Sequence, residues 1–430
     1  MNEDSGDRAI TGTTAADVVV VGGGLSGMTL GVALAASGVK VTVLDSLPPV
    51  LQQDEPFDGR ASAIARASQQ ALTAIGVWDA GLDAAAAPIL DIRVSDGKPG
   101  RRASPLFLHY GSDLLDGLPL GWIVENRALR RALFRRAAEL PGFELLAPVE
   151  VTGAERDTGG ARVHLADGRM VRGQLLAACD GRRSSMRTQA GIGWTGWDYP
   201  QDGLVCTISH SRPHGGRAHE HFLPSGPFAV LPLTDDEAGR HRSSIVWTER
   251  KPIADAVFGL SDEAFAAEVA RRFGPSLGEI GVLGRRWRYP LSLGFATRMT
   301  DQRLALVGDA AHVIHPIAGQ GFNLGLRDIA ALVECVRQAR RLGLDAGSGG
   351  VLAGYERWRR FDNFALAAVT DVLNRLFSND LPPVRLARDV GLAAVHRMPG
   401  LKRLFMRHAM GMVGELPPLL RGEAPGGPGR

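Results

Sequence analysis

The chain has 430 residues, of which 45% are hydrophobic and 22% charged, as in a globular protein long enough for two or three domains. A formal net charge of +3 argues against nucleic acid as a partner. Three widely spaced cysteines without a CxxC pair indicate a reducing cytosol and no disulfide framework. The polar start, MNEDSGDRAITGTTAAD, has no signal-peptide pattern and predicts disorder, as does the end, GEAPGGPGR.

The segment DVVVVGGGLSGMTLGVALAASGVKVTVLD (17–45) allows two interpretations. Its uncharged run from Val18 to Val39 is long enough for a bilayer span, which takes about 20 apolar residues. Four consecutive valines followed by three glycines, however, favour a buried strand and a turn. A helical apolar pattern then ends at Ser37-Gly38, and VKVTVL alternates like a second strand. The segment therefore predicts a βαβ unit and not a membrane anchor.

The glycine spacing in this unit is that of a nucleotide-binding turn. Gly22 would permit the tight turn, Gly24 the approach of a pyrophosphate, and Gly27 the close packing of helix on strand. Free N–H groups and the dipole at the helix N-terminus would hold the phosphates. Asp45 follows at the spacing of an acid that hydrogen-bonds a ribose, about 20 residues on. The alternative, a glycine-rich packing turn, is weakened because strand, helix and acid are all in place.

A second segment, RLALVGDAAHVIHPIAGQGFNLGLRD (303–328), also joins an apolar strand to glycine and aspartate. The strand would deliver Gly308 and Asp309 to the ligand-binding edge of a parallel sheet. A helical pattern begins at Phe322, and its N-terminus would point N–H groups at whatever lies over that edge. Such a helix would suit the electron-rich side of a reduced flavin.

A third segment, LLAACDGRRSSMR (175–187), repeats this order. A short apolar strand leads to Asp180, with Ser184 and Arg187 beyond it. Each segment alone could be a turn with a capping aspartate. Three in one chain favour a shared cofactor site.

Together these segments resemble the FAD-dependent aromatic hydroxylases, and within them the monooxygenases of ubiquinone biosynthesis. The resemblance rests on the order GxGxxG, DGxxSxxR (180–187), and GDAAH with HPxxGQGFN (308–323). Further matching stretches are DGRASAIARAS (58–68), VENRALRRAL (124–133), EHFLPSGPFAVLPL (220–233), SSIVW (243–247) and TDVLNRLFSND (370–380). It covers the chain from about Asp17 to Gly414, and Asp45, where the family more often has Glu, is a small departure.

The resemblance implies bound FAD and assigns residues to it. It puts the pyrophosphate at the three glycines and the adenosine ribose at Asp45. The other implied contacts are Asp309 to the ribityl chain, the backbone of Gly321, Phe322 and Asn323 to the isoalloxazine, Arg127 from the start of its helix, Arg60 near the flavin or pyrophosphate, and Asp180 supporting the cofactor and the domain junction. For Arg60, an exposed arginine without a phosphate partner is the alternative.

The predicted fold class is α/β, with a discontinuous Rossmann-like FAD-binding domain, an inserted antiparallel-sheet substrate domain and C-terminal helices. The FAD-binding domain is assigned residues 17–74, 106–186 and 290–340. Short β-rich segments between Pro/Gly turns predict the substrate-binding domain, residues 75–105 and 187–289. Residues 341–430 predict a helical region with a disordered tail.

The C-terminal region is basic between Leu381 and Gly414. It predicts either an amphipathic surface for anionic lipid or a partner, or a helix packed on its own domain. The first interpretation would give a cytoplasmic protein a peripheral contact at the inner face of the membrane. A homo-oligomer is left open. The basic residues are Arg385, Arg388, Arg397, Lys402, Arg403 and Arg407, against the single acid Asp389.

A histidine-rich run, HSRPHGGRAHEHF, raises the question of a metal site. His219 and His221 share a strand face, but nothing puts His210 or His214 beside them, so pocket-lining or surface histidines are favoured over a metal. HVIHP (312–316), inside the segment 303–328, is likewise interpreted as structural. A hydrolase fails because GLSG lacks the GxSxG spacing of a nucleophile elbow.

The resemblance implies an FAD-dependent monooxygenase. NAD(P)H would reduce FAD as a transient donor, because no second GxGxxG follows, and reduced flavin with O₂ would hydroxylate a polyprenylated phenol in ubiquinone biosynthesis. The protein would supply positioning, a water-excluding cavity and dipoles. The sequence identifies no catalytic base. Two alternatives stay open: an FAD enzyme of another substrate, aromatic or isoprenoid, and a non-catalytic flavin- or quinone-binding subunit.

Overall fold

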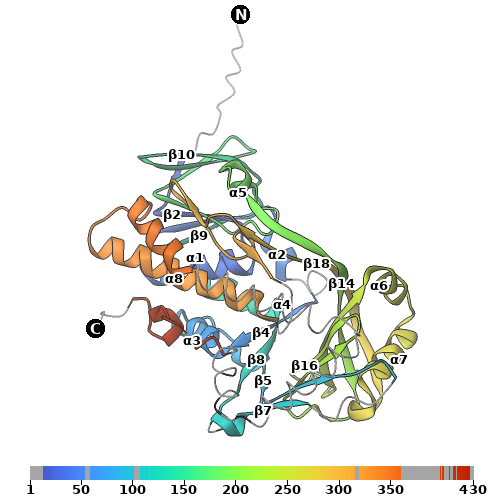
Figure 1. The fold of residues 1–430 in the computed structure, drawn as a ribbon. Helices are drawn as coiled ribbons and strands as arrows, with labels where there is room; N and C mark the ends of the chain where they lie inside the picture. Colours follow the sequence, from blue (N-terminus) through green and yellow to red (C-terminus); the bar gives the residue numbers. More distant parts are fainter. Residues whose placement is uncertain are drawn as a thin grey trace, which may run out of the picture.

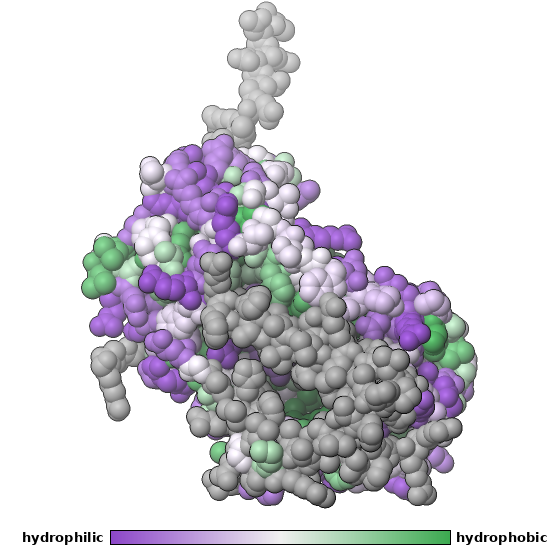
Figure 2. All heavy atoms as spheres, viewed as in Figure 1, coloured by the Kyte–Doolittle hydropathy of each residue, from purple (hydrophilic) through white to green (hydrophobic). Residues whose placement is uncertain are grey.

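The computed structural model describes residues 13–53, 59–100, 107–115, 117–314, 319–359, 398, 400, 406, 410–412 and 414–426. Figure 1 shows a helix-covered sheet at one end of the molecule and a long antiparallel sheet at the other. The helix-covered sheet is the first body and the long antiparallel sheet the second. Strands β14 and β18 extend from the second body towards the first (Figure 1). In Figure 2, hydrophilic residues make up much of the visible described surface of both bodies.

A six-stranded sheet carries the three segments that join a strand to glycine and aspartate. Its order is β19-β20-β13-β2-β3-β9, parallel except for the edge strand β19. Because β2, β13 and β20 are neighbours and run in one direction, the turns that follow them meet at one edge of the sheet. The strands are β2 (Val18–Val21), β3 (Val41–Leu44), β9 (Phe143–Leu146), β13 (Leu175–Ala178), β19 (Thr300–Asp301) and β20 (Leu304–Leu306).

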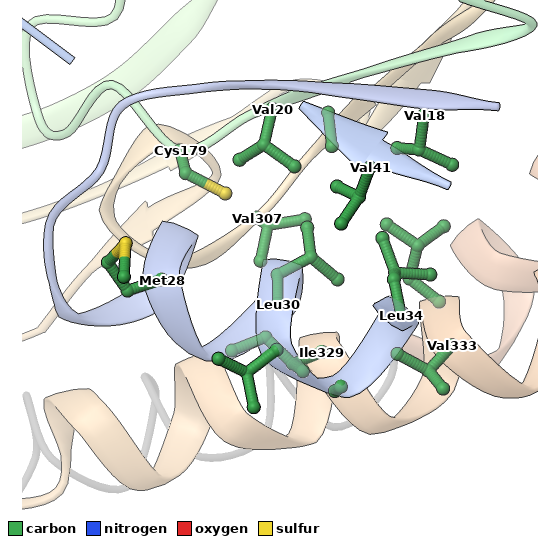
Figure 3. Packing of buried hydrophobic residues seen from close by; sticks show 14 of the residues in the cluster. Val18, Val20, Met28, Leu30, Leu34, Val41, Cys179, Val307, Ile329 and Val333 are labelled. Carbon is green, nitrogen blue, oxygen red and sulfur yellow. The ribbon is translucent and has the colours of Figure 1, made fainter. Parts of the chain in front are cut away.

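Helix α1 (Leu25–Ala36) lies between this sheet and the long helix α8 (Gly321–Arg341). In Figure 3, Leu30 and Leu34 of α1 lie between the sheet valines and Ile329 and Val333 of α8. The helix is apolar nearly all round because protein covers it on both sides, which explains its resemblance to a membrane span. In the part of the chain that the structure describes, no helix is long and apolar enough to cross a bilayer.

An eight-stranded sheet, β21-β18-β14-β17-β16-β15-β6-β7, forms the second body. Its central strands are antiparallel, and β6 joins β15 in parallel. The α/β class with an FAD-binding domain and an antiparallel sheet is therefore confirmed. The strands are β6 (Asp91–Asp96), β7 (Leu108–Gly111), β14 (Trp194–His210), β15 (Arg217–Leu223), β16 (Gly226–Leu233), β17 (His241–Arg250), β18 (Ile280–Ala296) and β21 (His312–Val313).

One face of this sheet is covered by α6 (Lys251–Phe258) and α7 (Asp262–Phe273), which the sequence analysis did not predict. Phe228 and Trp247 of the sheet form a core with Phe265 of α7. The local signal was present: the Ser261 hydroxyl accepts a hydrogen bond from the Ala264 N–H at 3.2 Å and caps α7.

Two small sheets complete the described fold. The sheet β4-β8-β5 lies between the two bodies, and β1-β12-β11-β10 lies beside the six-stranded sheet (Figure 1). Strand β1 corrects the expectation of disorder at the N-terminus, because residues 13–15 pair in parallel with β12. The strands are β4 (Ala61–Ala65), β5 (Ala86–Ile89), β8 (Gly121–Glu125), β1 (Thr13–Ala15), β10 (Val151–Asp157), β11 (Gly160–Leu165) and β12 (Met170–Gly173). The remaining α-helices with described bounds are α2 (Pro49–Gln53), α3 (Arg66–Ala74), α4 (Asn126–Ala138) and α5 (Ser185–Gln189).

The C-terminal residues return to the first body. The 3₁₀ helix η7 (Pro418–Arg421) packs on α3 and α8, and residues 422–426, expected in a disordered tail, continue from it with defined positions. The six basic residues of the predicted lipid or partner surface lie outside the described residues. The domain boundaries stay a prediction. Strand β7 lies in the segment 106–186 assigned to the FAD-binding domain, and β18 crosses the limit between residues 289 and 290, yet both strands pair within the eight-stranded sheet.

Candidate active site

The glycine turn after β2 is shaped by close backbone contacts. Gly22 has φ +99°, and a Cβ there would lie 2.4 Å from the carbonyl oxygen of Cys179. A Cβ at Gly27 would lie 1.8 Å from the carbonyl oxygen of Gly22, so α1 approaches the strand too closely for any side chain. At Gly24 the opposite holds, because nothing lies within 4 Å of a built Cβ. Two glycines thus permit packing, and the third leaves open space at the N-terminus of α1.

Asp45 closes one side of this turn at the end of β3. Its Oδ2 accepts a hydrogen bond from the Gly23 N–H at 2.5 Å, and its Oδ1 accepts one from the Leu47 N–H at 2.7 Å. Gln52 adds a third bond to Oδ1 at 3.2 Å. The carboxylate is therefore held beside the glycines, and the ribose contact that its spacing predicts stays a prediction.

The turn after β20 presents Asp309 at the same sheet edge. Gly308 has φ +62°, and its Cβ would lie 2.8 Å from the Ser26 hydroxyl, so this turn lies against the start of α1. The Asp309 side chain is exposed, yet surrounding protein raises its carboxyl pKa, while the charges of His312, Arg60 and Arg182 lower it. The carboxylate is therefore accessible although protein surrounds it. No described residue donates a hydrogen bond to it.

The turn after β13 holds Asp180 and connects the DGxxSxxR motif (180–187) to the GDAAH motif (308–312). Asp180 Oδ2 accepts hydrogen bonds from the Met186 N–H at 3.1 Å and the Ser185 hydroxyl at 3.2 Å. Its Oδ1 is buried without a hydrogen-bond partner among the described residues. Arg187, stacked 4.2 Å over the Trp194 ring, donates to the carbonyl of Ala310 at 2.9 Å. The arginine thereby ties this turn to the one that carries Asp309.

The first turn of α8 supplies Gly321, Phe322 and Asn323. Asn323 is buried, and its side chain pairs with β4: Oδ1 accepts from the Ala65 N–H at 3.0 Å, and Nδ2 donates to the Ala63 carbonyl at 2.8 Å. No side chain caps the helix N-terminus. The amide edge of Asn323 is therefore occupied by β4, and the positive end of α8 has no side-chain cap.

Arg60 and Arg127 are brought together by the pairing of β4 with β8. The Asn126 N–H donates to the Arg60 carbonyl at 2.9 Å. Arg60 is exposed and its guanidinium lies 4.9 Å from the Tyr289 ring centre, whereas Arg127, in the first turn of α4, pairs with Glu125 at 3.3 Å. Arg60 also contributes its charge at Asp309. The structure therefore brings Arg60 near the GDAAH motif that contains Asp309.

A buried network behind the Asp309 turn was missed by the sequence analysis. Asp328 of α8 is fully buried and accepts hydrogen bonds from the Gly308 N–H at 3.0 Å, His312 Nε2 at 2.5 Å and Arg359 Nε at 2.8 Å. Burial alone would raise the Asp328 pKa, but the charges and hydrogen bonds of His312 and Arg359 outweigh it and lower the pKa. His312 of HVIHP thus has the structural role that was predicted, as a hydrogen-bond partner of Asp328. The aspartate that ends the motif LGLRD was the sequence signal for this network.

The histidine run forms no metal site. His219 packs edge-on against Phe273, His221 bonds to the Ser95 hydroxyl at 2.9 Å, and His210 bonds to Ser243. Burial, then the charges of Arg217 and Arg93, lower the His219 pKa to about 4. Within the described ranges, no three His, Cys, Asp or Glu side chains are grouped to hold a metal ion.

The residues at this edge fit a flavin dinucleotide. A helix N-terminus beside a side-chain-free glycine suits a pyrophosphate, and a held carboxylate suits a ribose. The accessible Asp309 carboxylate and the unpartnered Asp180 Oδ1 are acceptors for hydroxyl groups. The positive end of α8 suits a flavin that gains negative charge on reduction.

Residues 15–357 match the family described as FAD binding domain, so the chain belongs to this family. The family and the relatives that follow make the chain an FAD-dependent monooxygenase. Its similarity to curated relatives extends over nearly the whole chain. The ubiquinone hydroxylase UbiL of Rhodospirillum rubrum is 52% identical over 410 residues, which cover 95% of this chain and 93% of that protein.

More distant relatives carry related names. The 3-demethoxyubiquinol 3-hydroxylase of Escherichia coli is 34% identical, covering 92% of this chain and 98% of its own. The human mitochondrial ubiquinone biosynthesis monooxygenase COQ6 is 31% identical, covering 92% of each chain. These relatives confirm the ubiquinone-hydroxylase resemblance stated from the motifs.

Solved structures share the fold. The p-nitrophenol 4-monooxygenase PnpA of Pseudomonas putida superposes with a TM-score of 0.75 at 20% identity, over 93% of this chain and 98% of that one. The Diels-Alderase PyrE3 has a TM-score of 0.72 at 25% identity, over 94% and 82%. Because the fold carries more than one chemistry, the activity must be argued from relatives and site.

Proposed function

We propose that this enzyme hydroxylates the aromatic ring of a polyprenylated phenol on the route to ubiquinone, using O₂ and electrons from NAD(P)H. The observation that carries the proposal is the 52% identity to a ubiquinone hydroxylase over nearly the full length of both chains. The intact cofactor edge supports catalysis over a purely binding role.

The chain's own residues would hold FAD at the sheet edge. Gly22, Gly24 and Gly27 would accommodate the pyrophosphate, and Asp45 would bond the adenosine ribose. When bound, FAD supplies the redox chemistry, accepting electrons from the nicotinamide and passing them to O₂. The remaining proposed contacts are Arg60, Arg127, Asp180, Asp309, and the first turn of α8 at Gly321, Phe322 and Asn323.

The two arginines have different roles in this proposal. Arg60 is exposed beside Tyr289 and near Asp309, so it can reach a phosphate or the flavin. Arg127 already pairs with Glu125, which also pairs with Arg242 at 3.2 Å. We therefore assign Arg127 a weaker contribution to cofactor affinity than Arg60.

The lipid tail of the substrate suggests a membrane contact. A polyprenylated phenol resides in the bilayer, so the enzyme must meet it at a membrane surface or receive it from a carrier. We assign this contact to the basic stretch between residues 381 and 414 on its charge alone. Co-sedimentation with anionic vesicles, lost when the six basic residues are replaced by glutamine, would support it; equal binding would refute it.

The proposed reaction is tested first by the visible spectrum of the purified protein. Flavin bands that bleach under anaerobic NAD(P)H faster when a short-chain prenylphenol is added are expected, followed by a product heavier by one oxygen when air is admitted. A bound flavin that no nicotinamide reduces would point to a separate reductase. Flavin reduction without oxygen transfer to any prenylphenol would overturn the assigned substrate class.

A further inference from the structure

The eight-stranded sheet has two faces with different partners. Residues paired in register share a face, so Glu220 of β15 lies on the same face as Ala229, Val246, Val205 and Trp287. The opposite face carries the core shared with α6 and α7. Figure 1 draws these helices on the outer side of the sheet. Glu220 is therefore on the inner side.

The inner face is directed at the cofactor-binding body. Trp287 lies against Gly59, where a Cβ would be 2.3 Å from the indole nitrogen, and Tyr289, two residues on, lies under Arg60. Near Glu220, Ala218 packs in one cluster with Ala63 of β4. The Ala63 carbonyl is bonded by Asn323 at the start of α8. The strand that carries Glu220 is thus connected to the first turn of α8 through β4.

Among the described residues, the neighbours of Glu220 on this face are apolar. Its cross-strand neighbours on this face are Ala229 and Val94, with Leu108 and Phe222 beside them. The side chain is half-buried, and no described residue hydrogen-bonds to its carboxyl.

The same face holds two unpartnered hydroxyls. Ser244 Oγ and Thr248 Oγ1 of β17 are buried without a hydrogen-bond partner among the described residues. They share the face of Glu220 because Ala229 pairs with Val246 between them. Buried hydroxyls left unpaired cost free energy. Ser244 and Thr248 are four residues, about 13 Å, apart along the strand, so one aromatic head could reach only one of them.

Burial raises the pKa of the Glu220 carboxyl to about 7, with no charged neighbour among its causes. The titratable and charged groups that face this side from neighbouring elements are Tyr110, Asp96, Arg242, Glu125, Tyr289 and Arg60. Burial also raises the Tyr110 pKa to about 12, so this phenol stays neutral. A carboxyl that titrates near neutrality is suited to exchange a proton with a phenol.

We propose that Glu220 is a catalytic residue of this enzyme, the base that accepts the hydroxyl proton of the phenolic substrate. The substrate O–H bond breaks, its electron pair stays on the phenolate oxygen, and the proton forms an O–H bond with the Glu220 carboxylate. The resulting phenolate is the more electron-rich ring for hydroxylation. This inference rests on the proposed function, since it requires a phenol bound against this face of the sheet.

The experiment uses FAD-loaded enzyme without NAD(P)H and 2-prenyl-4-nitrophenol, whose phenolate absorbs visible light. After subtraction of the flavin spectrum, wild-type enzyme should ionise the bound probe at a lower pH than Glu220→Gln, by at least about one pH unit. Glu220→Asp, which keeps a carboxyl, should restore part of the shift. His219→Gln, on the opposite face of the same strand, should behave as wild type.

Turnover gives a second readout. With a short-chain prenylphenol, Glu220→Gln should lower kcat/KM at neutral pH by about 10²-fold, as expected for loss of a general base. Should this variant fail to bind FAD, the infrared difference spectrum of wild-type enzyme decides: probe binding must produce a protonated-carboxyl band.

The outcomes separate the two proposals. Equal ionisation of the probe in wild type and Glu220→Gln, or no protonated-carboxyl band in wild type, overturns the role of Glu220 even if prenylphenols are hydroxylated. Glu220-dependent ionisation with no hydroxylated product from any prenylphenol overturns the proposed substrate class and leaves a phenol-binding base.

Discussion

Gly24 and Gly27 lie three residues apart in one turn, yet their surroundings differ. A Cβ at Gly27 would overlap the Gly22 carbonyl, whereas a Cβ at Gly24 would meet nothing within 4 Å. Gly27→Ala should therefore destabilise the apoprotein by about 1–3 kcal/mol or more. Gly24→Ala should leave apoprotein stability within about 0.5 kcal/mol but abolish most of the stabilisation on adding FAD.

Urea unfolding with and without FAD measures both effects. The prediction fails if Gly24→Ala binds FAD as tightly as wild type, because the open space would then serve no pyrophosphate. Asp45→Glu is the matched control. It keeps the carboxylate, so it should retain FAD-dependent stabilisation.

Glu220 predicts an unusual pH dependence of stability. Its folded pKa of about 7 lies above the usual 4.5, so the folded state favours the neutral carboxyl. The stability this preference gives is complete below the usual pKa and is lost as pH rises towards about 7. Glu220→Gln should therefore have a higher Tm than wild type near pH 8, and the difference should shrink near pH 5. Thermal unfolding at both pH values measures it, and a difference that is the same at both would contradict it.

At the scale of elements, Asp328 connects α8, the Asp309 turn and the helical segment that contains Arg359. Asp328→Ala would leave His312 and Arg359 buried without their carboxylate, which should cost about 3–5 kcal/mol in urea unfolding. The half-exposed pair Arg136–Glu139 on α4 gives the comparison. Glu139→Ala should change stability by less than about 1 kcal/mol.

The same network predicts a response to acid. The Asp328 pKa is lowered in the folded protein, so its contribution is present above the unfolded value of about 3.9 and is lost as pH falls through the folded pKa. The stability gap between wild type and Asp328→Ala should narrow below about pH 4. A gap that stays constant would show that Asp328 acts through packing alone.

At the scale of the whole molecule, the chain end closes the core of the cofactor-binding body. Leu420 is fully buried in the core that contains Leu72 and Leu332, and the Trp358 indole donates to the Glu415 carbonyl at 3.0 Å. Leu420→Ala should cost about 2–5 kcal/mol. Ending the chain after Arg421 should cost much less, since residues 422–426 are largely exposed. A large loss of Tm on that truncation would contradict this assignment.

Local patterns were sufficient to predict the elements that carry the cofactor site. The valine strand, glycine turn and apolar helix of residues 17–45 are short-range features, so their spacing specifies the turn geometry before any tertiary contact forms. The helices at 251–258 and 262–273 were missed, although Ser261 marks the start of the second. The strand at residues 13–15 was missed because its partner β12 lies far along the chain.

By itself, the sequence determined the cofactor class and the family, because glycine and aspartate spacing encodes local backbone geometry. Only the tertiary structure decided which distant residues act together. Asp309 and Arg60 approach each other, and Asp328 meets His312 and Arg359, through packing of elements far apart in the chain. In the sequence, Glu220 lies between His219 and His221, in the run for which a metal site was considered. Strand pleating turned the histidines outward and the carboxyl inward, and burial on that face is what shifts its pKa.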